Sequence, residues 1–297
     1  MGTEEMEAFR RIMRTQAAFA GVEVVTYCCM TNHFHLLLRV DPEQPADDGE
    51  LVRRFRALYG TKRSFSLGVD AEGLELVFAR NGERAEELRT RLRARMGQVP
   101  VFMRELKARF TLWYNAQHDC VGTLWAERYR SLLVEPGSCA ARFVAAYIDL
   151  NPVRAGLVED PRTYRFSGLG EAVGGGSLAR RGLCWLDPLV ERSNTVPDVY
   201  TAWQAHLKTV RGAMLRAGDS GAEELAEDGS MGAVDLAYRK CRYLTEGLAI
   251  GTQAWVSRFC KRGGCFGFRR DHTPTAIPGF EEAESDLSMA RQRLRGA

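Results

Sequence analysis

The sequence lacks several features that mark common protein classes. No apolar run reaches the roughly 18–20 residues that span a bilayer. No apolar signal segment leads the chain, and its eight cysteines include no Cys-x-x-Cys pair. These absences argue against a membrane protein, a secreted disulfide scaffold and a structural zinc site. We therefore expect a protein of the reducing cytoplasm that contacts no membrane.

The chain also carries little net charge. The 297 residues include 41 Lys or Arg and 38 Asp or Glu, so the formal net charge is +3, and 45% of residues are hydrophobic. This composition excludes a disordered tail and a collagen-like repeat, and it points only weakly to an acidic partner. The length allows one large or two modest domains.

The first 40 residues predict a helix followed by a hairpin. Apolar residues from Met6 to Ala17 recur at helical spacing, and Gly21 is expected to end that helix. The period then changes to two over Val22 to Cys29 and His33 to Val40, which predicts two buried strands. The second strand places His33, His35, Leu37 and Arg39 on one face.

Residues 41–97 predict an insert with Arg-rich helices. A loop over residues 41–48 precedes helical patterns from Glu50 to Tyr59 and from Gly82 to Arg95, with a loop at Gly68 to Gly73 between them. The arginines fit either a solvated helix face with Glu partners or a phosphate-tracking surface. A further helix, from Val101 to about Gln117, carries aromatic side chains that we assign to the core.

The next segment predicts a strand and a helix. Arg128 to Glu135 has the pattern of a strand. Ser138 is a suitable N-cap for a helix that should finish at Asn151, because the residue before Pro152 is biased out of the α region. Gly168 to Gly176, with five Gly in nine residues, predicts the boundary of the core domain.

The remaining residues predict a mostly helical extension. Residues 217–232 have the composition of a flexible linker. Helices near Val234 to Leu244 and Thr252 to Lys261, with a turn at Gly247 and Gly251, would form a helix-turn-helix. The basic residues Lys261, Arg262, Arg269 and Arg270 make this region a candidate for DNA binding.

Two pairs of residues carry the chemistry that the sequence suggests. His33 and His35 are one residue apart in a strand, so both imidazoles can converge on one divalent cation, although two structural histidines would give the same pattern. Tyr147 and Asn151 are four apart in the predicted helix and share a face. Taken alone, the second pair is more typical of a packed core Tyr and of an Asn that ends a helix before Pro.

Three segments in order resemble one family. Residues 27–39 (Tyr-Cys-Cys-Met-Thr-Asn-His-Phe-His-Leu-Leu-Leu-Arg) resemble the His-hydrophobe-His signature of the HUH single-tyrosine transposases. Residues 122–131 and 146–158 are similar to motifs of the REP-associated tyrosine transposases, which are of the insertion-sequence-200-like type. The resemblance covers about residues 5–170, interrupted by the insert at roughly 41–97, and becomes faint afterwards.

The resemblance implies a fold, a site and a reaction. The fold is α+β, with a ferredoxin-like or RRM-like antiparallel sheet in a catalytic domain over residues 1–170, followed by a separate region over 171–297. Mg²⁺ or Mn²⁺ would be held by His33, His35 and Asn151, and Tyr147 would be the nucleophile. A monomer or homodimer would cleave and rejoin single-stranded or hairpin DNA through a 5′-phosphotyrosine intermediate. Arg39, Arg128 and Arg130 are candidate phosphate contacts.

The chain departs from the family pattern at its start. Relatives carry a strand ahead of the first helix, whereas this chain enters that helix almost directly, at Glu4. We therefore expect one strand of the sheet to be missing. This expectation leaves open an inactive, truncated or domesticated protein that binds hairpin DNA without cutting it. A metal-dependent phosphohydrolase that uses water as the attacking group is the third alternative.

Overall fold

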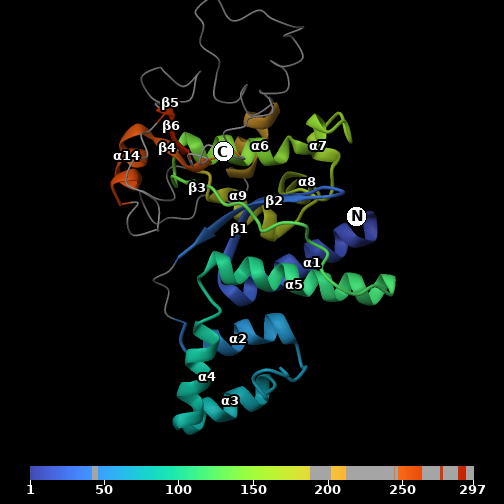
Figure 1. The fold of residues 1–297 in the computed structure, drawn as a ribbon, viewed down its shortest axis with the longest axis vertical. Coiled ribbons are helices and arrows are strands. Elements are labelled where there is room, and N and C mark those ends of the chain that lie inside the picture. Colours follow the sequence, from blue (N-terminus) through green and yellow to red (C-terminus); the bar gives the residue numbers. More distant parts are fainter. Residues whose placement is uncertain are drawn as a thin grey trace, which may run out of the picture. The chain divides into compact units, whose positions relative to one another are not determined.

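The chain forms two compact units. It contains both helices and strands (Figure 1), which is compatible with the predicted α+β class. The computed structural model describes residues 1–41, 46–187, 202–211, 244, 247–262, 275–276 and 287–291. Unit 1 contains Met1–Val24, Cys29–His33 and Leu38–Tyr129, and unit 2 contains Val25–Cys28, Phe34–Leu37 and the chain from Arg130 onward. None of the described helices is long and apolar enough to cross a membrane.

Helix α1 (Thr3–Ala20) confirms the first predicted element. Phe9 and Met13 of its apolar stripe are fully buried, and the helix packs against α2 and α5 of unit 1. Gly21 ends the helix with φ of 65°, a left-handed conformation that side-chain-bearing residues avoid. The sequence therefore placed both the stripe and the stop of this helix correctly.

The predicted hairpin is present, with one correction. Strands β1 (Val22–Cys29) and β2 (Phe34–Val40) form a two-stranded sheet. The backbone N–H of Met30 donates to the carbonyl oxygen of His33 at 2.8 Å. Because this bond closes the turn, His33 is a turn residue and β2 begins one residue later than predicted.

The insert folds as three short helices around a core of their own. Helices α2 (Asp48–Tyr59), α3 (Ala71–Arg80) and α4 (Glu83–Arg93) lie together in unit 1 (Figure 1). Their leucine and phenylalanine side chains are buried in one cluster. Helix α3 was not predicted, and its first residues fall in the predicted loop at Gly68 to Gly73. The missed signal was Asp70, whose side chain accepts from the N–H of Gly73 as an N-cap, followed by Leu74 and Phe78 at helical spacing.

The Arg-rich helices carry acidic partners. Ion pairs within the insert use arginines from both predicted helices, which favours the solvated helix face over a phosphate-tracking surface. The pairs join Arg53 and Arg54 to Glu50, Arg56 to Glu75, Arg84 and Arg91 to Glu87, and Arg89 to Asp48 and Glu86.

A partly buried ion pair fastens α5 (Val99–His118) within unit 1. The carboxylate of Glu105 accepts from Nε and Nη2 of Arg95 at 2.7 and 2.8 Å, and from the side chain of Gln16 at 2.9 Å. Burial raises the pKa of Glu105, but these hydrogen bonds and the positive charge of Arg95 outweigh it, so the pKa is lowered overall. The pair therefore stabilises the fold above the ordinary carboxyl pKa, and this contribution is lost as the pH falls through the lowered value.

Replacement of Arg95 by Met is expected to destabilise unit 1 by about 2–4 kcal/mol at neutral pH, because the Glu105 carboxylate would be left without its charge partner. Urea denaturation followed by circular dichroism measures this loss. Arg84→Met is the matched control, because Arg84 and its partner Glu87 are both about half exposed. Equal stability of the two variants would contradict the assignment of Arg95 as a structural cation.

The predicted strand from Arg128 to Glu135 is reduced to β3 (Leu133–Val134). The residues before β3 are tied to α5 of unit 1: the indole N–H of Trp125 donates to the carbonyl of Lys107 at 3.1 Å, and the ammonium of Lys107 donates to the carbonyl of Glu127 at 2.8 Å. These bonds hold the backbone against α5 immediately before the segment in which the strand was predicted.

The first part of the glycine-rich segment, which was predicted to be the boundary of the core domain, is a helix. Helix α8 (Gly168–Val173) begins at an N-cap formed by Ser167. A Cβ at Gly168 would lie 2.2 Å from Oγ1 of Thr26, and one at Gly170 would lie 2.0 Å from the carbonyl oxygen of Tyr164. The glycines thus permit close packing inside unit 2, and the domain boundary predicted near residue 170 falls within that unit.

The described C-terminal residues add strands as well as helices. Helix α9 (Ser177–Cys184) packs against α8, and the predicted turn at Gly247 and Gly251 is instead strand β4 (Gly247–Thr252). The predicted helix after it is present as α14 (Gln253–Arg262). Strand β4 pairs in parallel with β3, and the sheet continues through β6 (Leu287–Arg291) to β5 (Thr275–Ala276).

These strands correct one prediction. Because strand β4 occupies the predicted turn, the described residues do not form a helix-turn-helix. Helix is still the commonest structure in the described part of the extension, since residues 171–173, 177–184, 202–211 and 253–262 are helical. The structure places β2 in a two-stranded sheet and β3 in a separate four-stranded sheet. The predicted linker at 217–232, most of the predicted helix at 234–244, and Arg269 and Arg270 lie outside the described residues.

Candidate functional site

The histidine-bearing strand and helix α6 (Cys139–Asp149) meet within unit 2. Ser138 caps the helix as predicted, because its hydroxyl accepts from the N–H of Ala140 at 3.1 Å. Val25 and Leu37 of the hairpin pack in one cluster with small residues of α6, among them Ala145. Because strand residues alternate between faces, His35 lies on the same face as Leu37 and is directed toward the helix.

His35 and Tyr147 are in contact. Their ring centroids are 6.1 Å apart and the two rings are nearly perpendicular, at 84°. Tyr147 is 6% exposed, so its ring is fixed by packing. The structure therefore brings together one predicted metal ligand and the predicted nucleophile, which come from distant parts of the sequence.

The residues after Tyr147 fold back onto it. Helix α6 ends at Asp149, and the short helix α7 (Asn151–Arg154) follows, so the predicted end at Asn151 is wrong by two residues. Pro152 lies in the first turn of α7, where its missing N–H costs nothing. The side-chain amide of Asn151 donates to the carbonyl of Tyr147 at 3.3 Å, and Nη2 of Arg154 donates to the same carbonyl at 2.9 Å.

His33 lies in the hairpin turn and belongs to unit 1. Its Nδ1 is 2.7 Å from Oδ1 of Asn32. The residue is at the surface, yet neighbouring atoms displace water from part of its ring, and this desolvation lowers the pKa of His33. A neutral ring that donates from Nδ1 to Asn32 carries its lone pair on Nε2, which is the form that ligates a metal.

The three predicted phosphate contacts occupy different surroundings. Arg39 is a half-buried residue near the end of β2, whereas Arg128 and Arg130 are exposed in the irregular segment that precedes β3. Arg39 and Arg128 belong to unit 1 and Arg130 to unit 2. Their role in binding phosphate stays a prediction.

A buried carboxylate that the sequence analysis did not select lies on the other side of α6. Asp149 is fully buried and accepts from the hydroxyl of Thr26 at 2.9 Å, from the N–H of Leu169 at 3.1 Å, and from Nε2 of His206 at 2.8 Å if that nitrogen carries the proton. Residues two apart on a helix point in nearly opposite directions. Asp149 therefore anchors the back of α6 while Tyr147 occupies its front.

Replacement of Asp149 by Ala is expected to lower the free energy of unfolding of unit 2 by about 3–5 kcal/mol, because three buried hydrogen-bond donors would lose their acceptor. Asp149→Asn should cost less, since its amide oxygen still accepts. The exposed residue Glu159 provides the control variant Glu159→Gln. Denaturant midpoints that are the same in all three variants would show that Asp149 is not an anchor.

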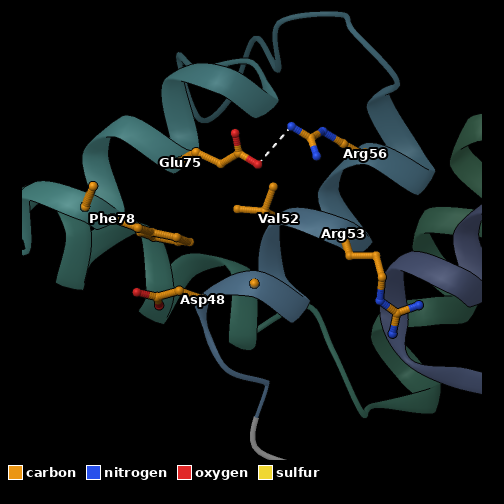
Figure 2. Close-up of a pocket in the computed structure, with 8 residues that line it drawn as sticks. Asp48, Val52, Arg53, Arg56, Glu75 and Phe78 are labelled. Carbon is orange, nitrogen blue, oxygen red and sulfur yellow. Dashed lines mark hydrogen bonds and ion pairs between the residues drawn. The ribbon is translucent and has the colours of Figure 1, made fainter.

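A shallow pocket opens in the helical insert of unit 1. Its volume is about 570 Å³, and its walls include Val52, Arg53, Arg56, Glu75 and Phe78 of α2 and α3 (Figure 2). Nη2 of Arg56 lies 2.8 Å from the carboxylate of Glu75, and Arg53 pairs with Glu50. Asp48, which also lines the pocket, pairs with Arg89. Because each charged side chain of the wall is held in an ion pair, we assign no chemistry to this pocket.

The described residues contain no group of three or more His, Cys, Asp or Glu side chains that could hold a metal ion. The predicted ligands are not such a group, because they comprise two histidines and the amide oxygen of Asn151. No family model, curated protein or solved structure matches the chain. The functional argument therefore depends on the residues of this chain.

Proposed function

We propose that the protein is a metal-dependent single-strand DNA transposase or nickase of the HUH single-tyrosine type, with Tyr147 as its nucleophile. The observation that carries the proposal is the contact of the Tyr147 ring with His35 of the His-x-His segment. A phenol packed against a potential metal ligand, on a helix anchored from behind by Asp149, is the arrangement that tyrosine attack on a phosphate requires. We further propose that β1, β2 and α6 belong to a ferredoxin-like core.

The three proposed ligands carry donor atoms of the kinds that bind divalent cations. His33 and His35 would offer imidazole nitrogens and Asn151 its Oδ1, since the amide nitrogen of Asn151 is engaged with the carbonyl of Tyr147. Imidazole ligands favour Mn²⁺, whereas oxygen ligands and abundance favour Mg²⁺. When bound, either ion would withdraw charge from the scissile phosphate.

Tyr147 would then carry out the exchange. Its phenolic oxygen forms a bond to phosphorus as the bond from phosphorus to the 3′ oxygen breaks; the phenolic proton passes to water, and the 3′ oxygen takes up a proton to leave as a hydroxyl. The result is a 5′-phosphotyrosine link. Because the new link conserves the energy of the phosphodiester, the reverse attack by another 3′ hydroxyl rejoins DNA without ATP.

Single-stranded or hairpin DNA is the proposed substrate. A stiff duplex resists the bending that would bring one phosphate beside a buried ring such as that of Tyr147, whereas a single strand adapts to it. The proposal thus predicts a preference for an unpaired segment next to a hairpin over a fully paired duplex of the same sequence.

Incubation of the protein with labelled hairpin DNA and Mn²⁺ tests the proposal. A label at the 3′ end should become covalently attached to the protein, whereas a label at the 5′ end should leave on the released fragment, and EDTA should prevent both. Binding without an adduct would favour the non-cutting DNA-binding protein. Cleavage without an adduct would favour the phosphohydrolase.

A further inference from the structure

Arg154 covers one face of the Tyr147 ring. The central carbon of its guanidinium lies 3.7 Å from the ring centroid, which is well inside the range of a favourable cation–π contact. The same guanidinium donates from Nη2 to the backbone carbonyl of Tyr147 at 2.9 Å. It is therefore fixed at two points, on the ring and on the backbone of a single residue.

The fold between the two residues makes this contact. Residues seven apart on a helix share a face but are separated by about 10 Å along its axis. The break between α6 and α7 at Leu150, with Pro152 in the next turn, leaves Arg154 beyond the end of α6. Its long side chain extends back toward the N-terminal side, which is the direction that helical side chains favour.

We propose that Arg154 is a positioning residue that holds the phenol of Tyr147 in the orientation needed for attack on DNA. With Arg154 on one face of the ring and His35 in perpendicular contact with it, rotation of the ring away from the histidine is opposed. A nucleophile that keeps one orientation retains the near-attack geometry that a freely rotating one loses. The effect of Arg154 on catalysis rests on the proposed function, whereas its effect on the orientation of the Tyr147 ring does not.

The rate of adduct formation gives the first test. Arg154→Met keeps an unbranched chain close to the apolar stem of Arg and removes the guanidinium, and it should slow single-turnover adduct formation roughly 10- to 100-fold with little change in DNA affinity. Arg154→Lys retains a cation and should recover part of the rate. Arg162→Met, at an exposed arginine paired with Asp160 in the same unit, should leave the rate unchanged. Loss of DNA affinity in proportion to the rate would instead make Arg154 a phosphate contact and overturn the proposal.

The orientation of the ring gives a second test that needs no activity. With 3-fluorotyrosine incorporated at position 147, the wild type and Arg154→Lys should each give a single ¹⁹F resonance. Arg154→Met should shift or split it, while its thermal unfolding stays close to that of the Arg162→Met control. An unchanged ¹⁹F spectrum in Arg154→Met would overturn the proposal. If the wild type forms no adduct, the proposed function fails, and the ¹⁹F spectrum alone decides whether Arg154 holds the ring.

Discussion

Replacement of Tyr147 by Phe is expected to abolish covalent attachment to DNA, with a fall of roughly 1,000-fold or more in adduct formation. Phe keeps the aromatic ring, so the perpendicular contact with His35 and the stacking of Arg154 are both preserved. The change therefore removes the attacking oxygen and little else. Denaturing gels that separate protein with and without bound labelled DNA measure the result.

Two comparisons make the Tyr147→Phe result specific. Tyr129→Phe, at a half-buried tyrosine outside α6, should leave adduct formation intact. Thermal unfolding of Tyr147→Phe should match that of the wild type, because the ring still fills its site. Persistent cleavage in Tyr147→Phe together with its loss in His33→Ala would transfer the reaction to water and sustain the phosphohydrolase.

Replacement of His35 by Ala is expected to eliminate Mn²⁺ binding and to lower cleavage by roughly 1,000-fold or more, since a metal ion stabilises the transition-state charge by several kcal/mol. His35 is half-buried in β2, so the loss of its ring also removes a contact of Tyr147. Titration calorimetry with Mn²⁺ separates the two effects, because it reports metal binding in the absence of DNA.

His118→Ala is the matched control for the His35 variant. His118 lies at the end of α5 and pairs with Glu5 of α1, with Nε2 and the carboxylate oxygen 3.0 Å apart. Its removal should leave Mn²⁺ binding unchanged. Equal Mn²⁺ affinity in the wild type and in His35→Ala would remove the histidine from the ligand set and weaken the proposed mechanism.

Local patterns predicted the elements that local forces determine. The apolar stripe and Gly21 defined α1, and the alternation of residues from Val22 to Cys29 defined β1 to the residue. Ser138 marked the start of α6. In each case the responsible contacts lie within a few residues of the chain, where periodicity and capping are sufficient guides.

Contacts between distant residues account for the errors. The strand expected from Arg128 onward is reduced to Leu133–Val134, and the residues just before Arg128 are hydrogen-bonded to α5 through Trp125 and Lys107. The glycines of α8 permit close approach to Thr26, which a sequence alone does not distinguish from a linker. The partnership of Asp149 with His206 joins residues far apart in the chain.

The residues of the candidate site also divide into those that a local pattern predicts and those that depend on distant contacts. Spacing alone predicted that His33 and His35 share one face of the second strand, and that Tyr147 and Asn151 share one face of a helix. The contact of Tyr147 with His35 rested on the family resemblance, and the structure places the two rings together. No local pattern predicted the stacking of Arg154 on Tyr147. It depends on the short helix α7, which follows α6 at a point where the sequence predicted only the end of a helix.

Identification of the residue that carries DNA tests the central claim most directly. Trypsin should release residues 143–154 of the adduct as one peptide, and Tyr147 is its only tyrosine. After nuclease trimming, mass spectrometry should find a nucleotide joined to that tyrosine through its 5′ phosphate. This product should form in the presence of Mn²⁺ and be absent when EDTA is added. A nucleotide on any other residue, or an unmodified peptide after complete cleavage of the DNA, would contradict Tyr147 as the nucleophile.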